Sequence, residues 1–294
     1  MRSTIQLFLK GLAMGSADVV PGVSGGTIAF ISGIYETLLA SISAFNFSLI
    51  KTFKTDGFAG VWKAVNGSFL LPLFAGIATA IVTLAKTVTY LMDTQPIGIW
   101  SFFFGLVLAS ILLVVQMVKK WTFKVLLWGG LGIGIAYKIT LLTPASTDEL
   151  SLIYLFFCGV IAICAMILPG ISGSFILVLL GAYRYVLDSL HERNWAVIVT
   201  FSVGCFLGIT SFSHLLKWLF AKFHDLTVAC LAGFMLGSLA KVWPWRDTVI
   251  DQPISPGTLA KMGGDPQFAL ALALMVFGGL LVLGLEAIGR KKAS

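Results

Sequence analysis

The sequence predicts an all-α, polytopic membrane protein built from two inverted-topology repeats, each a re-entrant helical hairpin followed by three transmembrane helices. Three observations support this prediction. The 294 residues are 58% hydrophobic and only 11% charged, with a mean hydropathy of +0.97, whereas a soluble domain is about 25% charged. Six apolar runs are long enough to cross a bilayer. A Pro-Gly motif interrupts one further apolar segment in each half of the chain.

The repeated motif reads Pro-Gly-Val-Ser-Gly-Gly at residues 21–26 and Pro-Gly-Ile-Ser-Gly-Ser at residues 169–174. A Pro-Gly pair breaks a helix. Backbone that leaves the helix inside a bilayer must bond to other protein groups or line a water-filled cavity. Two such breaks in corresponding halves are typical of a transporter binding site.

The first predicted repeat covers residues 1–150. Two apolar arms, 3–20 and 22–45, surround the first motif and are each long enough to reach the middle of the bilayer. A basic connector with Lys51, Lys54 and Lys63 follows. We then expect three membrane spans, at residues 69–92, 97–118 and 125–142.

The second predicted repeat covers residues 151–294 and follows the same plan. Its arms are 151–168 and 170–190, and its spans are 195–216, 226–243 and 267–288. An offset of 148 residues aligns the two motifs and also aligns Tyr35 with Tyr183; farther on, an offset of 132 aligns Gly76 with Gly208. The internal similarity therefore supports the division into two repeats.

Three crossings in each repeat are an odd number, so the second repeat is expected to be inverted relative to the first. If the N-terminus and the C-terminus are cytoplasmic, thirteen basic residues lie inside and five outside, as the positive-inside rule requires. A reading in which each hairpin crosses the membrane fully, giving ten spans, also inverts the second half. Charge counting therefore leaves that alternative open.

Composition also excludes several functions. The basic residues lie in short clusters between apolar stretches, a pattern that encodes membrane orientation and not nucleic-acid binding. The four cysteines fall inside apolar segments without metal-ligand spacing, so we expect neither disulfides nor a metal site. No cofactor motif is present.

The motif residues are the predicted phosphate-binding site. The serine of each copy is placed to cap the second arm, and the glycines leave backbone N–H groups uncovered, so two helix N-termini would face a shared anion. The alternative is that Pro-Gly merely breaks a helix and that small residues allow close packing. The predicted contacts are Gly22, Ser24, Gly25, Gly26, Thr27, Gly170, Ser172, Gly173 and Ser174.

Ionisable residues inside apolar segments are the second set of candidates, because an unpaired charge there is costly. Asp18 lies three residues before the first motif and aligns with Met166; we expect it to carry a proton or cation, or to be a neutral acid bonded to the loop. Glu36 and His214 are further candidates for proton coupling. Arg184 and Lys86 are candidates for the lipid phosphate, with membrane-surface anchoring as the alternative.

The strings ADVVPGVSGGT (residues 17–27), GIYE (33–36) and LPGISGS (168–174) resemble the bacterial and archaeal polyprenyl-phosphate transporter family. The resemblance covers nearly the whole chain. It implies a transporter in the cytoplasmic (inner) membrane that returns undecaprenyl phosphate from the outer to the inner leaflet. Its partners would be this lipid, the surrounding membrane lipids and a coupling ion, H⁺ or Na⁺. The resemblance assigns no residue roles and leaves a homodimer open.

Two rival functions fit part of the sequence. Gly22-Val23-Ser24-Gly25 matches the GxSG string of rhomboid-type intramembrane serine proteases, and His214 is a candidate base. The motif is duplicated whereas this histidine is not, which disfavours an enzyme. A small-anion channel could use the same anion site. We predict a transporter without catalytic activity.

Overall fold

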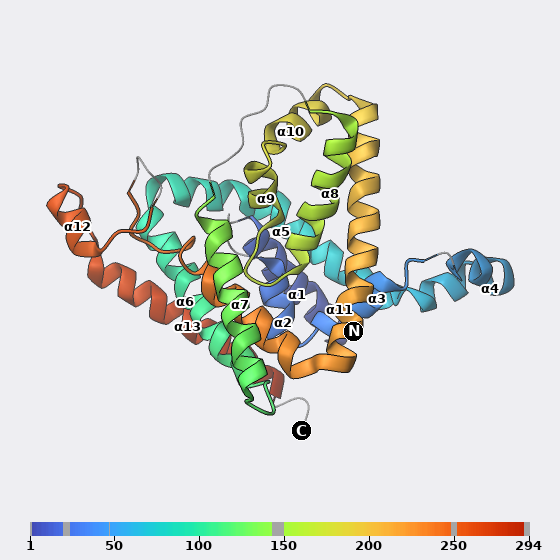
Figure 1. Ribbon diagram of the computed structural model, residues 1–294, viewed down its shortest axis with the longest axis horizontal. Helices are drawn as coiled ribbons and strands as arrows, with labels where there is room; N and C mark the ends of the chain where they lie inside the picture. Colours follow the sequence, from blue (N-terminus) through green and yellow to red (C-terminus); the bar gives the residue numbers. More distant parts are fainter. Residues whose placement is uncertain (1, 20–23, 47, 143–149, 248–251, 291–294) are drawn as a thin grey trace.

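The computed structural model describes residues 2–19, 24–46, 48–142, 150–247 and 252–290, and within them the chain is helical (Figure 1). These parts contain no named strand, only an isolated bridge between Arg246 and Pro253. The helices are α1 (Arg2–Asp18), α2 (Gly25–Ile31), α3 (Tyr35–Ser43), α4 (Ser48–Ala64), α5 (Gly67–Thr94), α6 (Pro96–Val115), α7 (Phe123–Thr140), α8 (Leu152–Ile167), α9 (Gly173–Leu179), α10 (Tyr183–His191), α11 (Trp195–Ser238), α12 (Pro256–Lys261) and α13 (Phe268–Arg290).

All six predicted spans lie on helices, which confirms an all-α polytopic membrane protein. Among the described residues, α5, α6 and α11 are each long and apolar enough to cross a bilayer, and α2–α3 and α9–α10 qualify as bent pairs. Helix α11 has 44 residues and leaves helical geometry at Phe223. This break lies between the spans predicted at 195–216 and 226–243, so one bent helix supplies both.

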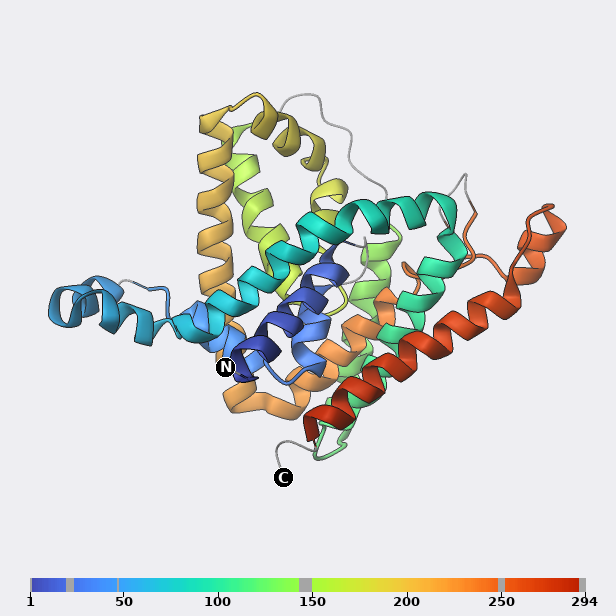
Figure 2. The same ribbon diagram turned by 180° about the vertical axis from the view of Figure 1, so that it is seen from behind.

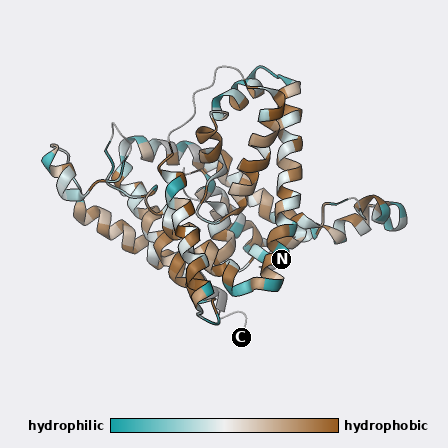
Figure 3. Ribbon diagram, viewed as in Figure 1, coloured by the Kyte–Doolittle hydropathy of each residue, from teal (hydrophilic) through white to brown (hydrophobic). Residues whose placement is uncertain are grey.

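Large apolar side chains face outward over much of the surface. Val82 on α5 is 79% exposed and Phe123 on α7 is 80% exposed, and Figure 3 shows hydrophobic residues along the helices of the bundle. A soluble protein does not expose apolar area on this scale, whereas a bilayer covers it. The outward faces of these helices are therefore lipid-facing.

Four helix pairs form the bundle: α1 with α5, α8 with α11, α6 with α13, and α7 with α11. Glycines bring the backbones together in each pair. A Cβ atom on Gly208 would lie 2.8 Å from the Val160 carbonyl oxygen, and one on Gly132 would collide with the Cys230 carbonyl. The last two pairs join residues 1–150 to residues 151–294. The third transmembrane helix of each predicted repeat, α7 or α13, therefore packs against a helix of the other repeat.

The second arm of each predicted hairpin is broken, contrary to the continuous arms expected at 22–45 and 170–190. Helix α2 ends after seven residues, and the axis of α3 is bent by 116° from that of α2. Helix α9 also has seven residues, and the axis of α10 is bent by 104° from that of α9. Gly33 (φ +71°) and Gly181 (φ +68°) make the two bends, in a conformation that glycine adopts without steric cost. The predicted connector with its three lysines forms helix α4.

Helices α1 and α8 enter the middle of the bundle from opposite edges (Figure 2). Each ends at a motif, and each motif begins a seven-residue helix. The fold therefore brings the two motifs to one place. The inversion of one repeat relative to the membrane stays a prediction.

Candidate functional site

Three hydrogen bonds join the two motifs. We call residues 24–27 together with Tyr35 the first tip and residues 166–174 the second tip. Ser24 Oγ donates to the Met166 carbonyl at 3.2 Å, the Tyr35 hydroxyl donates to the Ile167 carbonyl at 3.1 Å, and the Gly170 N–H donates to Thr27 Oγ1 at 3.0 Å. The last carbonyls of a helix lack partners within it, so the first half of the chain caps α8.

The first tip is closed by this contact. Ser24 and Thr27 are fully buried, and a Cβ atom on Gly26 would lie 2.6 Å from the Ile167 carbonyl oxygen. Glycine is required here because two backbones touch. For this tip, close packing is thus part of what the small residues do.

The N–H groups at the start of α2 already have partners. Gly25 N–H donates to Asp18 Oδ1 at 2.6 Å, and Gly26 N–H donates to Ser24 Oγ at 3.1 Å. The predicted N-cap role of Ser24 is confirmed. The prediction of uncovered N–H groups is wrong for Gly25 and Gly170, because the Asp18 carboxylate and the Thr27 hydroxyl accept them. The predicted contact Gly22 lies outside the described residues.

Helix α1 also satisfies the other end of α2. Lys10 Nζ donates to the Ser32 carbonyl at 2.6 Å. Asp18 therefore lies at the positive start of α2 and Lys10 at its negative end, and both charges favour the orientation of the peptide dipoles. No local pattern in the sequence indicates this contact, because Ser32 lies 22 residues beyond Lys10 in the chain.

The second tip lacks both charges. Met166, which is 41% exposed, occupies the position that aligns with Asp18, and its Cβ lies near the start of α9 at Gly173. The Tyr154 hydroxyl donates to the Leu180 carbonyl at 2.8 Å. Ser172 stands at the N-cap position, but its side chain bonds to the Ser174 hydroxyl at 2.8 Å and makes no cap bond.

A small cavity, partly open to the surroundings and with room for about one water molecule, lies beside the second tip. Its polar groups come from three elements: Thr140 on α7, Ser172 on the tip, and Ser238 and Lys241 at the end of α11. The ammonium of Lys241 lies 4.8 Å from the centre of the Phe175 ring. The cavity is lined by Ala136, Ile139, Thr140, Gly170, Ile171, Ser172, Phe175, Ser238 and Lys241.

The chemistry of the cavity favours an anion. It offers one ammonium and three hydroxyls and no carboxylate among its lining residues, and Lys is a common phosphate ligand. In this conformation Thr140 donates to the Tyr137 carbonyl and Ser238 to the Met235 carbonyl, so an entering anion would compete with these local bonds. Sequence reasoning missed Lys241 because it ends a span far from the motif in the chain.

The remaining predicted site residues lie away from these contacts. Arg184, Lys86, Glu36 and His214 are exposed on α10, α5, α3 and α11. Within the described part of the chain, none of them shares a hydrogen bond or ion pair with either tip, and His214 Nδ1 pairs with the Thr210 carbonyl of its own helix at 2.8 Å. Their predicted roles in phosphate binding and coupling stay predictions.

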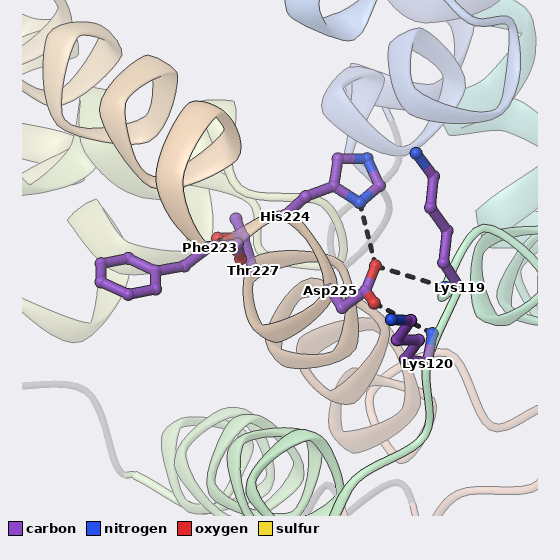
Figure 4. A network of polar contacts seen from close by, with 6 residues as sticks. All are labelled: Lys119, Lys120, Phe223, His224, Asp225 and Thr227. Atoms are coloured by element: carbon purple, nitrogen blue, oxygen red, sulfur yellow. Dashed lines mark hydrogen bonds and ion pairs between the residues drawn. The ribbon is translucent and has the colours of Figure 1, made fainter.

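A second polar link between the halves lies at the bend of α11 (Figure 4). The Asp225 carboxylate accepts the N–H groups of Lys119 at 3.2 Å and Lys120 at 3.0 Å, and His224 Nδ1 lies 3.2 Å from it. The Lys119 N–H and the His224 side chain hold the pKa of Asp225 below its usual range. Among the described residues, no group of three His, Cys, Asp or Glu is placed to hold a metal ion.

Comparison with known proteins gives consistent results. A family described as undecaprenyl phosphate translocase-like matches residues 14–258. The chain is 47% identical to the polyprenyl-phosphate transporter of Vibrio cholerae, over 98% of this chain and 97% of that protein. It is 35% identical to the polyprenyl-phosphate transporter of Staphylococcus aureus, over 82% and 87%. No solved structure matches.

Proposed function

The chain belongs to the undecaprenyl phosphate translocase-like family, and we propose that it moves the phosphate headgroup of a polyprenyl lipid from the outer to the inner leaflet of the cytoplasmic membrane. Both relatives bear the name of polyprenyl-phosphate transporters. A phosphate anion crosses hydrocarbon only at high cost, whereas an apolar polyprenyl tail can stay in the lipid beside the protein. The protein therefore needs a site for the headgroup alone.

The cavity beside the second tip is the proposed headgroup site, and the single observation that supports it is the position of Lys241. This lysine lines the cavity together with Ser172, Thr140 and Ser238. An ammonium among hydroxyls can form charge-assisted hydrogen bonds with phosphate oxygens. Gly173 and Ser174 begin α9 on the same tip and complete the proposed contact surface.

Entry of a phosphate group requires a movement, because the cavity has room for about one water molecule. The halves cannot separate as rigid bodies while α7 packs on α11 and α13 packs on α6. We therefore assign the movement to the second tip and α9, with the bends at Gly170 and Gly181 as hinges. This movement would expose the headgroup site to each side in turn.

Coupling to protons is proposed to run through Asp18. Moving a negative charge toward a negative interior costs about 2.3 kcal/mol per charge per 100 mV, and a proton carried with it offsets this cost. The Asp18 carboxylate bonds to the first tip, which in turn bonds to the second tip. Glu36 and His214 are proposed to relay protons, and Arg184 and Lys86 to recruit the lipid at the outer surface.

The headgroup site is tested by transport of a polyprenyl phosphate in proteoliposomes. We expect Lys241→Gln to lower the initial rate at least about tenfold, since a charge-assisted bond contributes about 1.5–3 kcal/mol. Lys261→Gln, a change of an exposed lysine on α12, is the matched control and should transport normally. An unchanged rate in Lys241→Gln, with the protein folded, would exclude this site.

The coupling proposal has a separate test. Asp18→Asn keeps an oxygen for the Gly25 N–H but cannot exchange a proton. We expect this variant to transport at a rate that no longer responds to an imposed pH gradient, while the wild type responds. A variant that keeps the full response, or a wild type driven only by a sodium gradient, would contradict a proton carried by Asp18.

The protease alternative has no support from the geometry. Ser24 is fully buried and its hydroxyl donates to the Met166 carbonyl, whereas His214 is exposed and bonded to its own helix. A nucleophile needs its base within hydrogen-bond reach. We propose that the chain has no catalytic activity, and labelling of Ser24 by a fluorophosphonate would contradict this.

A further inference from the structure

Helix α4 has no counterpart in the second half of the chain. The first half inserts α4 between α3 and α5, whereas the second half passes from α10 to α11 through residues 192–194 alone. The helix projects away from the bundle (Figure 1), and none of its residues is buried. A helix that contributes nothing to the core needs another reason to be apolar.

Helix α4 is nevertheless rich in large apolar side chains. Ile50 is 59% exposed, Phe53 60%, Phe58 71% and Trp62 36%. Ile50 and Phe53 are three residues apart, and Phe58 and Trp62 are four apart with ring centroids at 6.2 Å, so each pair lies on one side of its helical segment. Gly57 (φ +64°, ψ −157°) separates the two segments.

Basic residues occupy the rest of the same helix. Lys51, Lys54 and Lys63 are all exposed, against the single acidic residue Asp56. The spacing of a helix places Lys51 on a different side from Ile50 and Phe53. In the second segment it places Lys63 on a different side from Phe58 and Trp62. An apolar side with aromatic residues, flanked by lysines, is the pattern of a helix that lies in the plane of a membrane surface.

We propose that α4 lies in the headgroup region of the bilayer and binds anionic phospholipids through Lys51, Lys54 and Lys63, with Phe53, Phe58 and Trp62 inserted among the acyl chains. The charge excess of the helix complements an anionic surface, and a second protein would have to match an apolar side that the bend at Gly57 divides in two. This inference does not depend on the proposed substrate, because it concerns the bulk lipid of the membrane.

The test uses the full-length protein with a fluorescent amino acid at position 58, in nanodiscs of zwitterionic lipid or of the same lipid with anionic phosphatidylglycerol. Quenching by bromine-labelled acyl chains reports insertion, and quenching by acrylamide reports exposure to water. We expect the ratio of lipid quenching to acrylamide quenching to rise at least about fivefold with anionic lipid. Replacing the three lysines by glutamine should abolish this rise, since each contributes about fivefold.

Two controls make the test decisive. The same probe at Met262, exposed beyond α12, should show no dependence on anionic lipid. Because α4 buries nothing, the triple Lys→Gln variant should keep the thermal stability of the wild type. Equal acrylamide quenching at position 58 in both lipids would overturn the proposal, and so would protection that appears only when two copies share a nanodisc.

Discussion

The two tips have the same backbone plan but different electrostatics. Each has a break, a seven-residue helix and a glycine bend, yet the first has Asp18 and Lys10 at the ends of its helix and the second has Met166 and Tyr154. Both tips are largely buried, but the N–H groups of Gly25 and Gly26 at the first tip are bonded to Asp18 and Ser24, whereas the second tip borders a cavity with Lys241. The first tip therefore makes the contact between the halves, and the second tip borders the cavity that we propose as the headgroup site.

One aligned position accounts for much of this difference. At the first tip, the Asp18 carboxylate is the anion that the start of α2 accepts, so the chain supplies its own ligand there. At the second tip, Met166 supplies no charge. The seven-residue helix α9 has only a small dipole of its own, and the positive charge of the site comes from Lys241 on another element.

The largest expected effect comes from giving the second tip the charge of the first. Met166→Asp places a carboxylate near Gly173 on the tip that borders the cavity, where its negative charge would repel a phosphate. We expect transport in proteoliposomes to fall at least about tenfold. Met166→Leu, a change of similar volume, should transport normally. If Met166→Asp transported at the wild-type rate, the two tips would not differ in the way described.

The next largest effect tests the role of the first tip as the structural contact. Gly26→Ala puts a methyl group 2.6 Å from the Ile167 carbonyl oxygen, and neither backbone can easily move. We expect a loss of stability of about 3 kcal/mol, measured by thermal unfolding in detergent. Gly130→Ala on α7, where a Cβ atom meets nothing within 4 Å, is the matched control and should be neutral or slightly stabilising.

A smaller effect is expected from removing one bond between the tips. Tyr35→Phe leaves the Ile167 carbonyl without the hydroxyl that bonds to it at 3.1 Å, in a buried place, and should cost about 1 kcal/mol. Tyr183, which aligns with Tyr35 but is 37% exposed, provides the control Tyr183→Phe. Equal losses in the two variants would show that the contact between the tips contributes no specific stability.

The sequence predicted the elements of this comparison better than their contacts. The broken segments and the serine cap at position 24 could be predicted, because Pro-Gly breaks and capping residues are local signals. Hydropathy likewise located the six spans, although one bent helix supplies two of them. Each of these features depends on neighbours in the chain.

What the sequence could not predict depends on distant partners. Lys10 and Tyr154 bond to carbonyls 22 and 26 residues away. Lys241 lines the cavity beside the second tip because α11 packs beside α7 and because Met235 on α11 lies against Gly170. The packing of α7 on α11 and of α13 on α6 has no local signature in the sequence either. The expectation that Asp18 could bond to the loop anticipated its hydrogen bond with the Gly25 N–H, but the glycines of the motif alone fit an empty anion site equally well.

The smallest expected effect concerns the other link between the halves, at Asp225. This carboxylate is partly exposed, so solvent screens its bonds to the N–H groups of Lys119 and Lys120. Because its pKa is lowered in the folded protein, its contribution to stability is present above the ordinary carboxyl pKa and is lost as the pH falls through the lowered value. Asp225→Asn should therefore lower the melting temperature slightly at pH 7, and this difference should shrink as the pH falls below the ordinary carboxyl pKa. Asp56→Asn on α4 should not change the melting temperature at any of these pH values. A loss at pH 7 as large as that of Gly26→Ala would mean that the exposed link, and not the buried tips, joins the two halves.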